Sequence, residues 1–108
     1  MNVIRKILIF CTVTIVFGCA SSYSPQEIGA FPENYEQLWN QYLMRAAKDP
    51  SSVQTAISKP SLTKEGWATC AVVNAKNGFG GYSGYKGWYV VYRRGAIVSA
   101  MEYSRCNR

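Results

Sequence analysis

Few side chains in this 108-residue chain could carry out chemistry: four cysteines and six carboxylates, with no histidine. General acid–base catalysis usually needs a histidine or paired carboxylates held in a cleft. The carboxylates are those of Glu27, Glu33, Glu36, Asp49, Glu65 and Glu102. None of them forms a close pair within a strand or loop pattern, and Asp49 has a local role where a helix ends. The sequence therefore predicts a protein that is not an enzyme.

The first cysteines belong to an N-terminus with the parts of a secretory signal. Arg5 and Lys6 form a charged n-region, and residues 7–17 are an uninterrupted run of 11 apolar or threonine residues. A helix needs about 20 apolar residues to cross a ~30 Å hydrocarbon core, whereas the h-region of a signal peptide has roughly 7–15. Residues 1–18 are therefore expected to be a cleaved signal peptide.

The run closes with Val16-Phe17-Gly18-Cys19. This tetrapeptide resembles the bacterial lipobox, although Phe17 stands where that pattern prefers a smaller residue. The resemblance implies cleavage before Cys19, diacylglycerol on its thiol and acylation, for example with palmitate, of the new amino terminus. Several acyl chains make a stable membrane anchor. An uncleaved anchor and an ordinary signal peptide cut near residues 20–22 are the alternatives.

The residue after the lipidated cysteine is thought to direct sorting in Gram-negative bacteria, where aspartate retains a lipoprotein in the inner membrane. Ala20 occupies that position, so the resemblance implies the outer membrane. Residues 20–30 are small, polar and without period, which predicts a flexible tether behind Cys19. Fully extended, such a tether reaches about 36 Å, and residues 31–108 would form one small domain.

Lipidation would give every cysteine a role: Cys11 leaves with the signal, Cys19 carries lipid, and Cys70 and Cys106 remain. In an oxidising envelope we expect this last pair to form a disulfide. The bridge would contribute roughly 3–4 kcal/mol through chain entropy. Two isolated cysteines without histidine cannot complete a zinc site, so no metal and no cofactor other than the covalent lipid is expected.

The charge balance narrows the classes of partner. The chain has 12 Lys and Arg against 6 Asp and Glu, and loss of Arg5 and Lys6 leaves a net charge of +4. This suits anionic headgroups or envelope polymers. It lacks the clustered basic stripe that is typical of nucleic-acid binding, and a solvated hairpin end explains the doublet Arg93-Arg94.

One helix and several strands must position these groups. Apolar residues recur at helical spacing at Tyr35, Leu38, Trp39, Tyr42, Leu43 and Ala46. The helix is expected to open at residues 31–34 and to end at Asp49-Pro50. Strand patterns follow over residues 53–58, 67–74, 85–94 and 96–104, with a loop at 61–66 and a tight turn at Gly95. The predicted fold is α+β, with one N-terminal amphipathic helix packed on a three- or four-stranded antiparallel sheet.

Residues 74–85, Asn-Ala-Lys-Asn-Gly-Phe-Gly-Gly-Tyr-Ser-Gly-Tyr, separate the two central strands, and we refer to them as the glycine-aromatic loop. Ser83 stands where a dinucleotide fingerprint would have its third glycine, and no helix pattern follows, so no nucleotide partner is expected. Two interpretations stay open. In one, Asn74 and Asn77 bond to neighbouring backbone groups and the aromatics cap the core. In the other, a partner-contact surface is displayed; its candidate residues are Lys76, Phe79, Tyr82, Tyr85 and Trp88.

The loop also resembles the motif Asn-Ala-Lys-Asn-x-x-Gly-Gly-Tyr-x-Gly-Tyr of uncharacterised small proteobacterial lipoproteins or secreted proteins. In that family the motif follows a helix ending in Lys-Asp-Pro-x-Ser, and this chain has Lys48-Asp49-Pro50-Ser51-Ser52. The resemblance implies a shared fold and an envelope location, and it carries no activity.

Together these patterns predict a membrane-anchored envelope lipoprotein that is a non-catalytic binding or structural module. Its expected partners are the membrane, through the lipid, and a protein or an envelope polymer. The alternatives are a phage- or plasmid-type exclusion lipoprotein, an accessory of a secretion apparatus and, last, a small envelope enzyme.

Overall fold

The amphipathic helix forms where its apolar stripe lies. A computed structural model describes residues 22–76 and 80–107, and in it α3 spans Tyr35–Ala46. The helix begins after Pro32 rather than at it, because the Tyr35 N–H donates to the Pro32 carbonyl at 3.0 Å in a preceding turn. Pro50 does not continue the helix and instead opens the short 3₁₀ helix η1, Pro50–Ser52.

The sheet has five antiparallel strands, where three or four were predicted. They are β1 Gln54–Ile57, β2 Ser61–Thr63, β3 Gly66–Asn74, β4 Lys86–Arg93 and β5 Ala96–Glu102. Their order is β1-β3-β4-β5, and β2 also pairs with β3. β4 pairs with β3 from Trp67 to Val73, and β1 pairs with the C-terminal part of β3. β4 continues into β5 through the two-residue turn Arg94-Gly95, as predicted.

The additional strand is β2, which pairs with the same edge of β3 as β1 but is separated from β1 by a break in the pairing. β1 pairs with Ala71–Asn74 and β2 with Gly66–Ala68, on the edge of β3 that β4 does not use. Pro60 lies between the two strands and cannot donate to the ladder. The expectation of a loop over 61–66 is therefore wrong for residues 61–63, which resume pairing as soon as the proline is passed.

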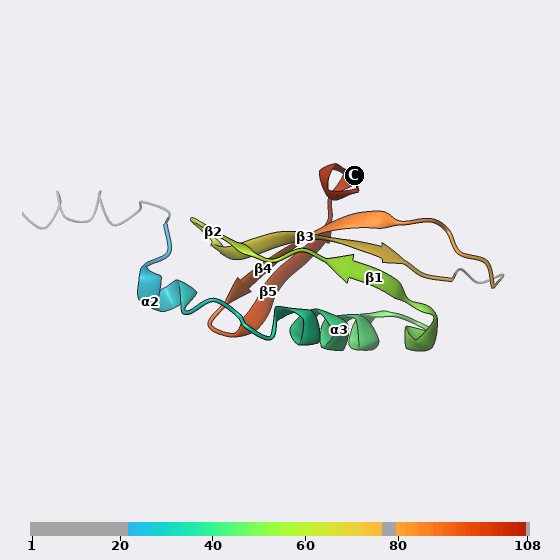
Figure 1. Ribbon diagram of the computed structural model, residues 1–108, viewed down its shortest axis with the longest axis horizontal. Coiled ribbons are helices and arrows are strands. Elements are labelled where there is room, and N and C mark those ends of the chain that lie inside the picture. The colour runs from blue at the N-terminus through green and yellow to red at the C-terminus, as the bar shows by residue number, and fades with distance from the viewer. Residues whose placement is uncertain (1–21, 77–79, 108) are drawn as a thin grey trace, which may run out of the picture.

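The core lies between α3 and one face of the sheet, as Figure 1 shows. Its buried members are Trp39, Leu43, Ala71, Val90 and Tyr92. The indole N–H of Trp39 donates to the hydroxyl of Thr55 at 2.9 Å, and that hydroxyl donates to the Val72 carbonyl at 2.7 Å. These bonds tie the helix to β1 and β3 without leaving a buried polar group unpaired.

The disulfide lies on the opposite face of the sheet. Cys70 neighbours Ala71, and because side chains alternate along a strand it points away from α3. After β5 the chain turns through η2, Ser104–Cys106, and brings Cys106 back over β3. The two residues form a disulfide with 5.2 Å between their Cα atoms. The predicted bridge is confirmed.

Most of the expected tether that the structure describes is folded. Residues Pro25–Ile28 form the short helix α2, and Ser24 and Glu27 cap it reciprocally. Ile28 is buried, and its carbonyl accepts from the Arg94 N–H at 2.8 Å. The expectation of a loose segment is wrong for residues 25–28, because the capping box orders α2 and the buried Ile28 and its carbonyl hold it on the end of the sheet.

Candidate functional site

The base of the glycine-aromatic loop is held by Asn74. This side chain is buried; its amide nitrogen donates to Gln54 Oε1 at 3.1 Å and its carbonyl oxygen accepts from the Gly84 N–H at 3.0 Å. An antiparallel bridge between Lys76 and Tyr82 continues the pairing of β3 and β4 beyond the sheet. The structural role predicted for Asn74 is thus confirmed, whereas Asn77 lies outside the described residues.

Two aromatic side chains of the loop face solvent. Tyr82 and Tyr85 have exposed fractions of 43% and 48%. The ammonium of Lys76 lies 5.8 Å from the centroid of the Tyr82 ring, within the range of a cation–π contact. The structure therefore brings Lys76 and Tyr82 together and leaves Tyr85 exposed nearby in sequence. Phe79, the fourth candidate of this loop, lies outside the described residues.

Trp88 does not belong to this exposed set. It lies on the helix face of β4, is half-buried, and its ring centroid is 6.2 Å from that of Trp39. Strand alternation explains the difference, since Trp88 shares a face with the buried Val90 and Tyr92. Its inclusion among the contact candidates is corrected accordingly: Trp88 is partly buried and packs against the core.

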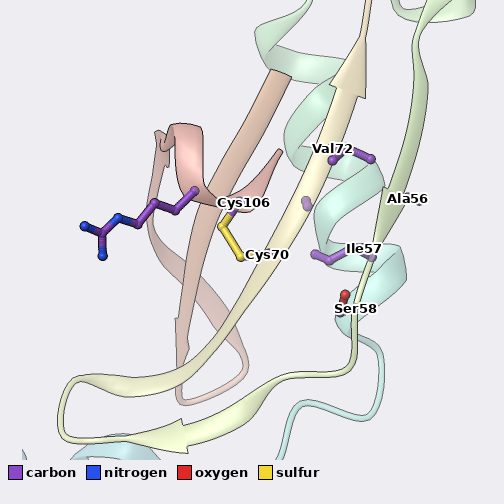
Figure 2. A pocket seen from close by; sticks show the side chains of 8 residues that line it. Ala56, Ile57, Ser58, Cys70, Val72 and Cys106 are labelled. Atoms are coloured by element: carbon purple, nitrogen blue, oxygen red, sulfur yellow. A yellow bond between two sulfur atoms is a disulfide. The ribbon is translucent and has the colours of Figure 1, made fainter. Parts of the chain in front are cut away.

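A shallow cavity beside the disulfide is a feature that sequence reasoning missed. It has a volume of about 330 Å³ and lies between β1, β3 and η2 (Figure 2). Its lining residues are Ala56, Ile57, Ser58, Cys70, Ala71, Val72, Arg105 and Cys106. Only Arg105 among them carries a charge, and a lone guanidinium offers no pair of proton-transfer groups. The cavity depends on how β1 pairs beside β3 and how η2 folds back over the sheet, and no local sequence signal encodes that.

The end of the sheet away from the glycine-aromatic loop carries a cluster of aromatic, apolar and basic side chains. The Arg93 guanidinium lies 4.0 Å from the Tyr23 ring centroid and donates to the Glu65 carbonyl at 2.6 Å. An apolar cavity of about 330 Å³ opens between α2 and β2. It is lined by Ser22, Tyr23, Pro25, Ile28, Gly29, Leu62, Thr63, Lys64 and Trp67. This end thus combines aromatic, apolar and basic groups, which the doublet Arg93-Arg94 alone did not reveal.

The carboxylates in these regions have structural partners. The Ser24 N–H donates to Glu27 Oε1 at 2.8 Å, and this bond is the main reason that the pKa of Glu27 lies below its ordinary value. Glu102 pairs with Lys86 at 3.8 Å on the surface. Burial raises the pKa of the Tyr92 hydroxyl, which stays protonated and donates to the Tyr35 carbonyl at 2.9 Å.

Metal and membrane features can be assessed for residues 22–76 and 80–107 only. In that part of the chain no group of three or more His, Cys, Asp or Glu side chains could hold a metal ion. No helix of that part is long and apolar enough to cross a membrane. Cys19, the predicted lipidation residue, lies outside it.

Comparison of the chain with protein-family models, curated proteins and solved structures gives no match.

Proposed function

We propose that the chain is a lipid-anchored protein of the bacterial cell envelope, held in the outer membrane through Cys19. The observation that carries the proposal is the tetrapeptide Val16-Phe17-Gly18-Cys19 directly after a charged and apolar signal pattern. The Cys70–Cys106 disulfide supports it, because such bridges persist in oxidising compartments outside the cytoplasm. The likeness of the glycine-aromatic loop to small envelope lipoproteins agrees with the same location.

The proposed activity of the anchored domain is non-catalytic binding of a protein or an envelope polymer. Tyr82 and Tyr85 support this, because exposed aromatics on a loop offer a large contact area at low entropic cost. Asn74 fixes the base of that loop through two hydrogen bonds, so the surface is presented from a rigid sheet. The carboxylates Glu27 and Glu102 already serve a helix cap and an ion pair, which favours binding over catalysis.

Mass spectrometry of the mature protein tests the anchor. The full chain would be expressed in a Gram-negative host and its N-terminal peptide sequenced. We expect a peptide that begins at Cys19 and carries diacylglycerol and an amide-linked acyl chain. Cys19→Ser should abolish processing and lipid, whereas the matched control Cys11→Ser should leave both intact. An unlipidated peptide beginning near residues 20–22, or retention of residues 1–18, would refute the anchor.

Crosslinking in intact cells tests the contact surface. The variant Tyr82→Ala/Tyr85→Ala is expected to lose the crosslinked partners of the wild-type protein while keeping its lipid and its disulfide. Val98→Ala serves as a control, because this β5 residue is 45% exposed and lies near the β4–β5 turn, at the end of the sheet away from the loop. An unchanged set of partners in the double tyrosine variant would exclude the loop as the binding surface.

A further inference from the structure

The chain between Cys19 and the folded domain is short. Already at Tyr23 the backbone N–H donates to the Lys64 carbonyl, at 3.4 Å, and α2 follows directly. Only three residue steps separate Cys19 from Ser22 in the sequence. Three steps reach about 10 Å at full extension. A lipid on Cys19 therefore places this part of the domain close to the membrane surface.

One end of the sheet gathers around α2, and we call it the α2 end. It consists of α2, the β2–β3 turn at Lys64-Glu65 and the β4–β5 turn at Arg94-Gly95, which lie together in Figure 1. The glycine-aromatic loop lies at the other end. β3 alone has nine residues, which corresponds to about 26 Å between the ends.

The surface of the α2 end has the chemistry of a headgroup contact. Leu62 and Tyr23 have exposed fractions of 61% and 44% there. Three of its side chains are cationic and two are anionic: Lys64, Arg93 and Arg94 against Glu27 and Glu65. The Glu27 carboxylate accepts from the Ser24 N–H in the cap of α2. Long basic side chains beside exposed apolar ones suit the boundary between acyl chains and anionic headgroups.

From these observations we infer that the α2 end docks on the anionic phospholipid surface that holds the anchor, and that the glycine-aromatic loop points away from it. The inference rests on the proposed lipidation of Cys19. Charge alone does not select the α2 end, because the loop end also carries cations. Lys76 lies on the loop, and Lys48 follows α3, whose C-terminal end lies on the loop side of the molecule (Figure 1). The short connection to Cys19 selects it, and Lys64 and Arg94 then contribute electrostatic attraction.

The experiment uses the complete lipidated protein in nanodiscs containing phosphatidylglycerol, with a gadolinium chelate on some headgroups. Paramagnetic relaxation of the backbone amides is measured along the chain. We expect a several-fold stronger effect at Leu62, Lys64 and Arg94 than at Tyr82 and Gly84. An equal effect at both ends, or a stronger effect at the loop, would overturn the docking.

Charge variants test which groups hold the orientation. The first variant is Lys64→Gln/Arg94→Asn, in which asparagine tolerates the φ of 52° at position 94. It should reduce the ratio of docked to undocked protein by about fivefold for each cation removed. Lys48→Gln/Lys76→Gln removes the same number of charges from the other end and should change nothing. Equal effects of the two variants would contradict the assignment.

The outcome also separates the two levels of the proposal. A lipidated protein that enters the nanodiscs but shows uniform relaxation overturns the docking surface alone. A protein without lipid on Cys19 that stays out of the nanodiscs overturns the anchor and the docking together. Mass spectrometry of the same sample tells these results apart.

Discussion

The α2 end and the loop end of the sheet differ in how their irregular segments are held. At the α2 end, the carbonyls of Ile28 and Gly29 accept from the Arg94 N–H at 2.8 Å and from the Trp67 indole at 3.1 Å. At the loop end, the Asn74 side chain accepts from the Gly84 N–H at 3.0 Å. The Ser83 N–H donates to the Ala75 carbonyl at 3.4 Å, so these hydrogen bonds lie near the base of the loop. Both segments are rich in small and polar residues, yet one is built into the sheet and the other displays two tyrosines.

The difference shows what converts a short segment into fixed structure. A segment is ordered when its backbone carbonyls and one apolar side chain are used by neighbouring strands, because these contacts offset the conformational entropy of a few residues. Ile28 provides that side chain at the α2 end. At the loop end, Tyr82 and Tyr85 keep about half of their surface exposed to solvent.

The largest expected effect belongs to the disulfide, which lies between the two ends. Replacing both cysteines in Cys70→Ala/Cys106→Ala should lower the free energy of unfolding by about 3–4 kcal/mol, because the bridge closes a long loop in the unfolded chain. Urea unfolding followed by tryptophan fluorescence measures this. Met101→Ala, a 56% exposed change on β5, is the control. A loss confined to one end, seen as two transitions, would show that the ends fold separately.

Two glycines test the packing contrast directly. A Cβ at Gly66 would lie 2.5 Å from the Tyr92 carbonyl oxygen, with φ at +142°. Gly66→Ala should therefore cost about 2–3 kcal/mol. Gly84 has φ at +99° but no atom within 4 Å of such a Cβ, so Gly84→Ala should cost about 1 kcal/mol from backbone strain. Similar melting temperatures for the two variants would erase the contrast.

Side-chain truncation gives the next smaller effect. Ile28 has an exposed fraction of 6%, and Ile28→Ala should destabilise the attachment of α2 by about 2 kcal/mol. Hydrogen exchange at the Arg94 amide, which donates to the Ile28 carbonyl, reports on it. Tyr85→Ala at the loop end should change stability by less than about 0.5 kcal/mol. A larger loss from Tyr85→Ala than from Ile28→Ala would reverse the assignment of the two ends.

The parts of the fold that have a local signal could be predicted from the sequence. The 3.6-residue stripe from Tyr35 to Ala46 gave α3, alternation gave β3 to β5, and two leftover cysteines gave the disulfide. Features set by distant partners could not be predicted: β2 forms because β3 has a free edge there, and α2 is attached to the sheet through Trp67 and Arg94. The capping box of Ser24 and Glu27 was a local signal for α2 that the sequence did offer. The prediction of Trp88 as a contact residue is wrong because, although Trp88 follows the loop closely in sequence, its position in β4 gives it the same face as Val90 and Tyr92.

The smallest effect concerns the acid stability of α2. The Ser24 N–H and hydroxyl hold the pKa of the Glu27 carboxyl below its ordinary value, with Arg93 and Arg94 adding to the effect. A depressed pKa contributes stability above the unfolded value of about 4.3, and this contribution disappears as the pH falls through the lower folded value. The attachment of α2 should therefore loosen as the pH falls below the unfolded value and through the lower folded one.

NMR shifts of the Ser24 and Glu27 amides during an acid titration measure this loosening. Glu27→Gln keeps a side-chain acceptor for the cap but does not titrate, so its α2 signals should not respond to pH in that range. The Gly84 amide at the loop end donates to Asn74, which also does not titrate, and should stay constant in both proteins. A matching shift at Gly84 would mean that acid acts on the whole sheet, and that the two ends are not held independently.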